Sequence, residues 1–307
     1  MKGISDIEFF DDESIKCCTL NKKNEIDTSY GKLVPQYDES AERHKFINSI
    51  SFYNNGNIKS IALQNQISIK TLSGVFKAEY LTFYEDGSLK KIFPLNGKLS
   101  GYWTEENEYS LAENMDIQLS IGKYTFKLIN INFYPSNAVK SITLWPKESV
   151  LIETPLGKIN TRIGVSFYEN GKIASIEPSD PVTVETKIGK LKAYDSIALG
   201  IHGENNSLKF SENRQVLALT TISNRIEIED KYGNNKSYEP SYRQSMCSDN
   251  EKEIVPLKIE FTNYSVIFNS NSDDEFNLDE CKFNITQLEV DYSKIRIGCT
   301  GCSGCSH

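Results

Sequence analysis

The residues with the clearest chemical character stand at the C-terminal end, which reads GCTGCSGCSH. Cys299, Cys302 and Cys305 follow one another at three-residue intervals, and His307 comes last. Thiolates are soft ligands, and CxxC spacing lets one turn aim two sulfurs at the same metal ion. The three cysteines with His307 could complete a zinc site, or with Cys281 they could hold an iron–sulfur cluster. The sequence therefore predicts a metal-binding tail over residues 299–307.

Two other interpretations of this tail stay open. A terminal segment rich in glycine and serine is commonly unstructured, and exposed thiols are open to oxidation or covalent modification. The chain has seven cysteines in no regular framework, and its N-terminus lacks the apolar stretch of an export signal. Free thiols or metal ligands are therefore expected rather than a disulfide network.

No catalytic residue is expected elsewhere. The three histidines, His44, His202 and His307, stand in no recognisable nucleophile arrangement. The glycines fall at turns between apolar runs, not in a phosphate-binding loop before a helix. The acidic run at 273–280 lacks the ligand spacing of an EF-hand.

The elements that precede the tail follow a repeated pattern that predicts β-hairpins. Residues 165–176 read VSFYENGKIASI, with apolar residues on both sides of Asn170-Gly171. An Asn-Gly pair supplies two residues that tolerate positive φ, as a tight hairpin turn needs. The same apolar spacing, with Phe always in the second position, begins at Ile7, Ile50, Leu81, Ile131, Val165 and Leu208.

A second, weaker unit alternates with the first, as in IETPLGKI and VETKIGKL. Each full repeat is therefore predicted to contain two short hairpins. An insertion near residues 93–111 lengthens the third repeat, and its TEENEYSLAEN stretch is the one expected helix, because Thr104 could cap it. The glycines of the second unit are Gly31, Gly74, Gly122, Gly157, Gly189 and Gly233.

The stretches FYENGKIASI, FYNNGNIKSI and FYEDGSLKKI resemble the core of the MORN-repeat-variant family, and LNGKLSGYW resembles its companion element. The resemblance covers roughly two thirds of the chain and departs from the pattern at Glu13, at Pro135-Ser136-Asn137 and at Arg214. It implies antiparallel hairpins used as binding or scaffold surfaces, and some family members are labelled antitoxins. The motif includes no catalytic residue.

The predicted fold is all-β, an elongated antiparallel β-meander of repeated hairpins. A six-bladed β-propeller is the alternative, because six repeats with four short strands each also suit that architecture. We expect three parts: a hairpin array over 1–235, a β-rich cap over 236–298 that covers the last strand edge, and the cysteine-rich tail over 299–307.

Charge and hydropathy limit the expected partners. With 34 Lys and Arg against 42 Asp and Glu, the net charge is −8, which disfavours nucleic-acid or anionic-membrane binding. No apolar stretch is long enough for a transmembrane helix. A cytoplasmic location is expected.

The sequence thus predicts a non-enzymatic protein-binding or scaffold repeat protein with a metal-binding tail. A zinc- or iron–sulfur-dependent redox protein and an antitoxin-like partner of a toxin are the alternatives. The tyrosines beside the repeated phenylalanines would suit recognition if exposed, or would otherwise cover the second face of the sheet.

We expect the full-length protein, purified without oxygen, to retain zinc or iron in its tail. Replacing Cys299, Cys302 and Cys305 together with serine should release the metal, because a hydroxyl is a far poorer ligand than a thiolate. Elemental analysis with ultraviolet–visible absorption measures the outcome, and Cys247→Ser serves as the control. Wild-type protein that carries neither metal would contradict the prediction.

Overall fold

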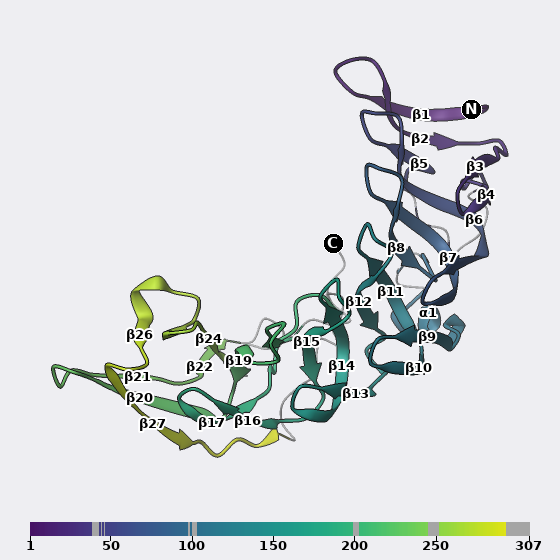
Figure 1. The fold of residues 1–307 in the computed structure, drawn as a ribbon. Coiled ribbons are helices and arrows are strands. Elements are labelled where there is room, and N and C mark those ends of the chain that lie inside the picture. Colours follow the sequence, from purple (N-terminus) through teal and green to yellow (C-terminus); the bar gives the residue numbers. More distant parts are fainter. Residues whose placement is uncertain are drawn as a thin grey trace. The chain divides into compact units, whose positions relative to one another are not determined.

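The fold is nearly all β (Figure 1), with 56% of residues in strands and 4% in helices. In this computed structural model, the described residues are 1–38, 43, 45, 47–97, 99, 103–198, 203–244 and 252–292. They form a long antiparallel sheet of hairpins and no closed barrel or propeller, so the predicted meander is confirmed against its alternative. The α-helix has seven residues, and the described part of the chain holds no helix able to cross a lipid bilayer.

The first of two compact units comprises residues 1–148 and 167–172. Its main sheet follows chain order as a meander of hairpins. Two further hairpins and the helix α1 (Glu105–Leu111) lie beside it. The main strands are β1 (Ile4–Phe9), β2 (Ile15–Leu20), β5 (Ile50–Phe52), β6 (Ile58–Thr71), β7 (Gly74–Phe83), β8 (Leu89–Phe93), β11 (Leu128–Phe133) and β12 (Val139–Leu144). The two hairpins are β3 (Ile26–Thr28) with β4 (Gly31–Leu33) and β9 (Met115–Leu119) with β10 (Gly122–Phe126).

The second unit comprises residues 149–166 and the chain from residue 173 onward. Its main strands are β13 (Val150–Thr154), β14 (Gly157–Phe167), β15 (Ile173–Pro178), β18 (Leu208–Phe210), β19 (Val216–Thr221), β24 (Leu257–Phe261), β25 (Ser265–Phe268) and β26 (Glu275–Asn277). Smaller sheets join β16 (Val182–Thr186) to β17 (Gly189–Ala193), β22 (Ser241–Gln244) to β23 (Lys252–Val255), and β20 (Asn224–Asp230) to both β21 (Asn235–Tyr238) and β27 (Cys281–Gln287). The predicted boundaries at residues 235 and 298 stay predictions.

The six hairpins of the first kind share one turn. In the stretch that begins at Val165, Tyr168 N–H donates to the Lys172 carbonyl and Gly171 N–H donates to the Tyr168 carbonyl, both at 2.8 Å. Gly171 has a φ of 80°, while Asn170 does not have a positive φ. This is a type I turn followed by one left-handed residue and a bulge. The prediction of a tight turn with two positive-φ residues is therefore wrong.

The three hairpins that depart from the repeat pattern have the same turn. Glu13, Asn137 and Arg214 stand where other copies have glycine, and their φ values are 65°, 66° and 66°. Their backbone hydrogen bonds repeat those at Gly171, as Arg214 N–H donates to the Ser211 carbonyl at 2.9 Å. Apolar spacing and strand pairing therefore hold the backbone in a region that costs an L-residue free energy.

The hairpins of the second kind use a two-residue loop. In the loop after β6, Thr71 pairs with Gly74, whose φ is 150°. The Thr71 hydroxyl donates to the Gly74 carbonyl at 3.0 Å and accepts from Ser73 N–H at 3.2 Å. The same threonine contacts recur before Gly31, Gly157 and Gly189, so the predicted second hairpin is confirmed at these positions.

The tyrosines of the first hairpins connect successive hairpins in the first unit. Tyr53 Oη donates to the Phe83 carbonyl at 2.9 Å, and Tyr84 Oη donates to the Phe133 carbonyl at 2.8 Å. Tyr134 Oη continues the series to the Phe167 carbonyl at 2.9 Å. Phe83, Phe133 and Phe167 are buried, and these three tyrosines are half-buried. Their hydroxyl groups are thus engaged within the sheet, as expected for residues that cover its second face.

The insertion carries the expected helix. Thr104 caps α1 and Asn107 completes a capping box, with Thr104 Oγ1 accepting from Asn107 N–H at 3.3 Å. The helix ends at Leu111, three residues before the predicted Asn114.

We expect Arg214→Gly to stabilise the protein by about 0.5–1 kcal/mol, because glycine adopts the left-handed region without the steric penalty that arginine pays. Thermal unfolding should show a higher midpoint for Arg214→Gly and no gain for Arg214→Ala, the control that removes the side chain alone. An equal gain in both variants would show that side-chain charge or bulk matters rather than φ.

Candidate functional site

The predicted metal ligands Cys299, Cys302, Cys305 and His307 lie outside the described residues. Cys281 lies in β27 opposite Asp230, and burial raises the pKa of its thiol. Within the described ranges, no group of three or more His, Cys, Asp or Glu side chains could hold a metal ion. Zinc or iron–sulfur binding by the tail stays a prediction.

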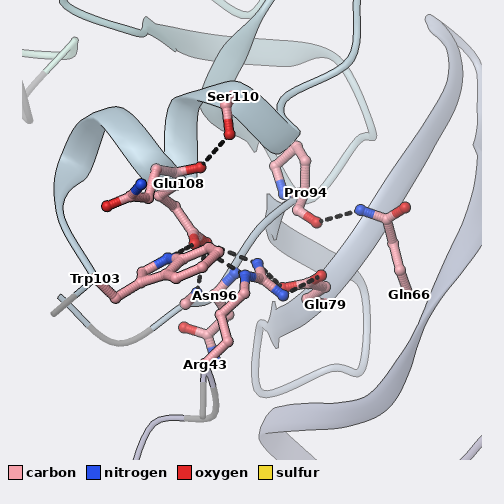
Figure 2. Close-up of polar contacts among 10 residues, drawn as sticks. Arg43, Gln66, Glu79, Pro94, Asn96, Trp103, Glu108 and Ser110 are labelled. Atoms are coloured by element: carbon pink, nitrogen blue, oxygen red, sulfur yellow. Dashed lines mark hydrogen bonds and ion pairs between the residues drawn. The ribbon is translucent and has the colours of Figure 1, made fainter. Parts of the chain in front are cut away.

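The first unit contains a cluster of charged side chains around Arg43 (Figure 2). The guanidinium donates to Glu79 through Nη1 and Nη2, at 3.1 and 2.8 Å. It also donates to Glu108 through Nε at 2.9 Å and Nη2 at 2.7 Å. Arg43 thus makes two bidentate contacts, the strongest geometry for a guanidinium and a carboxylate.

Glu108 of α1 is the most buried member of the cluster, with 4% of its surface exposed. It also accepts from Gly97 N–H and Trp103 Nε1, each at 2.7 Å. Burial favours the neutral acid, but the hydrogen bonds from Arg43 and Trp103 overcome it and hold the pKa of Glu108 below its usual value. A Cβ at position 97 would collide with this carboxylate, which explains the glycine.

The cluster fastens the insertion to the sheet. Glu79 belongs to β7 and also accepts from Asn96 N–H at 2.7 Å, while Glu108 belongs to α1. Their carboxylates are paired with Arg43 and with backbone donors, so neither is set up for proton transfer. The cluster is therefore structural. No local sequence pattern predicts this cluster, because Arg43 and Glu108 are 65 positions apart.

A buried acid occupies the second unit. Glu177, at the end of β15, is 1% exposed. Its two oxygens accept from Ser207, at 2.8 Å from the backbone N–H and 2.9 Å from the hydroxyl. Burial raises the pKa of Glu177 to about 7, against the lowering effect of the Ser207 hydrogen bonds. Such a pKa suits a general acid, but the enclosed side chain leaves a substrate no approach.

Arg162 of β14 lies near this acid but is engaged elsewhere. Its Nε donates to the Pro178 carbonyl at 3.2 Å and its Nη2 to the Asp195 carbonyl at 2.6 Å. Its guanidinium also lies over the Tyr194 ring, 5.0 Å from the centroid. Arg162 makes no ion pair with a carboxylate in the described part of the chain, which agrees with the raised pKa of Glu177.

An open groove of about 450 Å³ lies between β17 and β27 in the second unit. Ile188, Leu191, Phe283 and Ile285 supply its apolar lining. Its polar lining includes two lysines and no aspartate or glutamate. A concave surface of this size that combines apolar and polar side chains is a candidate binding site.

Comparison of the chain with models of protein families finds no match, and comparisons with curated proteins and with solved structures find none either. The resemblance to the MORN-repeat-variant family therefore stays a prediction from the hairpin residues. The redox and antitoxin alternatives stay predictions as well.

The buried acid predicts a distinct pH dependence. Glu177 has a raised folded-state pKa, so its stabilising contribution is complete below pH 4.5 and is lost as the pH rises through about 7. Over this range the wild type should lose up to about 3 kcal/mol of unfolding free energy through this group. We expect Glu177→Gln to remove that loss, because the amide does not ionise.

Chemical denaturation of both proteins at pH 5 and pH 8 measures the effect. The difference between the two pH values should be smaller in Glu177→Gln, whereas Glu153→Gln, at an exposed position, should behave as the wild type. An unchanged pH difference in Glu177→Gln would show that this carboxyl titrates normally.

Proposed function

We propose that the chain is a non-enzymatic protein-binding repeat protein, in which rigid hairpins present side chains to a partner. The observation that carries this proposal is the tip of the β6–β7 hairpin, where Leu72 is 83% exposed and Val75 is 57% exposed. We name these two residues the tip pair. Exposed apolar side chains close together in the sequence on a fixed backbone are suited to contacts with another protein.

The backbone beneath the tip pair is held in place. Thr71 closes the loop through the two hydrogen bonds described above. Gln118 N–H of β9 donates to the Ser73 carbonyl at 2.8 Å, which ties the tip to the next hairpin. A partner that binds here would therefore order little backbone, and the entropic cost of association would be small.

The fold does not require an apolar residue at position 72. The equivalent loop positions hold Ser29, Ser120, Pro155 and Lys187, so a polar side chain is compatible with the turn. Leu72 is thus available for recognition at no cost to the hairpin. The cytoplasmic location expected from the sequence is kept as part of the proposal.

We expect the double substitution Leu72→Ser and Val75→Thr to leave the fold intact and to weaken partner binding at least tenfold. Such a loss corresponds to about 1.4 kcal/mol, a modest value for two apolar contacts. Co-purification of the tagged full-length protein from its native host identifies the partner, and titration of the two purified proteins measures the affinity.

Leu217→Ser provides the control, because Leu217 is an exposed leucine, at 38%, outside any hairpin tip. It should bind the partner as the wild type does. Recovery of no stoichiometric partner, or equal affinity of the tip-pair variant and the wild type, would contradict the proposal.

A further inference from the structure

The groove between β17 and β27 combines apolar side chains, lysines and a strand edge. It lies in the second compact unit, whereas the tip pair lies in the first. β27 pairs with β20 on one side, and β17 pairs with β16 on one side. No other described strand pairs with β27, so its outer edge is open to a further strand, whereas Lys192 N–H on the outer edge of β17 already donates to Asn224. An unpaired strand edge offers backbone donors and acceptors to an extended segment.

The apolar and charged side chains of the groove lie on different faces of their strands. Phe283 and Ile285 alternate along β27 and are only half-buried, so they form the apolar floor, while the lining residues Ile188 and Leu191 are already buried. Alternate residues of a strand share a face, so an added strand would direct every second side chain toward this floor. Its apolar side chains would cover Phe283 and Ile285.

The charge of the groove indicates which side chains the second face of an added strand would carry. Lys190 and Lys192 line it, in a chain whose net charge is −8. Lys190 forms an exposed ion pair with Glu185 at 3.1 Å, and within the described ranges Lys192 forms no ion pair. Both lysines alternate with the buried Leu191 and therefore lie on the opposite face of β17. Carboxylates on the second face of an added strand would meet them.

The backbone of β17 contributes less to strand addition than that of β27, because one of its outward donors is occupied. Lys192 N–H points away from β16 and donates to Asn224 Oδ1 at 2.8 Å. In an antiparallel pair, residues two apart direct their backbone groups to the same side. Lys190 therefore also directs its N–H and carbonyl toward the groove side.

We propose that this groove binds an extended peptide segment of alternating apolar and acidic residues, which adds as a strand to the outer edge of β27. The backbone of the segment supplies the hydrogen bonds. Its apolar side chains cover Phe283 and Ile285, and its carboxylates pair with Lys190 and Lys192. The site is independent of the tip pair, and its test uses purified components.

Fluorescence anisotropy with the full-length protein tests this proposal, using a labelled, end-capped octapeptide of alternating valine and glutamate. Two matched peptides serve as comparisons: valine alternating with lysine, and the valine–glutamate peptide with one central valine replaced by proline. We expect saturable binding of the valine–glutamate peptide alone. Proline should weaken binding at least tenfold, because it lacks the N–H that a strand donates.

The double variant Lys190→Glu and Lys192→Glu should lose binding at least tenfold. Lys158→Glu is the matched control, because Lys158 follows Gly157 as Lys190 follows Gly189, and each lies opposite a glutamate across its hairpin. Lys158→Glu should bind as the wild type does.

Failure of the valine–glutamate peptide to bind the wild type, or equal binding of the lysine peptide, would overturn the proposal without any variant. Unchanged affinity in the double variant would also overturn it. A native partner that depends on the tip pair would still support the proposed function if the octapeptide fails.

Discussion

The structure depends on one constraint, which is that a single short hairpin cannot bury its own apolar face. An isolated two-stranded hairpin is marginally stable in water at best. Here four of the six hairpins bury their phenylalanine, at Phe83, Phe133, Phe167 and Phe210. In the first unit the adjoining tyrosines donate their hydroxyl groups to a neighbouring hairpin's backbone, as Tyr84 does to Phe133. Lys90 lies over the Tyr84 ring, 5.3 Å from its centroid, and covers it from solvent. Packing against neighbouring hairpins therefore supplies the apolar burial that a single hairpin lacks.

This use of aromatic residues affects where recognition can occur. Tyrosine is well suited to interfaces because it combines apolar area with a polar tip. Tyr53, Tyr84 and Tyr134 already use their hydroxyl groups inside the first unit. In the second hairpins the threonine and glycine contacts define the turn, and the first of the two central positions varies among Ser29, Leu72, Pro155 and Lys187. Contact chemistry can therefore vary at these loops without loss of the repeated framework.

Local sequence patterns predicted the hairpins, but they did not predict the contacts between residues far apart in the sequence. Apolar residues at fixed spacing around a polar turn identified each strand pair, since both signals lie within a dozen residues. The turn type was missed, because Asn170 and Gly171 are also compatible with a two-residue loop. The contacts of Arg43 with Glu108 and of Glu177 with Ser207 join residues 65 and 30 positions apart, and no short motif encodes them.

Glu108 and Glu177 show why such contacts matter more than burial itself. Both carboxyl groups are almost fully enclosed, yet the pKa of Glu108 is lowered and that of Glu177 is raised. Glu108 receives a guanidinium, an indole N–H and a backbone N–H, which together offset the loss of water around its charge. Among the described residues, Glu177 accepts hydrogen bonds only from the neutral N–H and hydroxyl of Ser207, while Arg162 donates its hydrogen bonds to carbonyl oxygens. Burial sets the cost of a charge, and the donors that surround it decide whether the charge is kept.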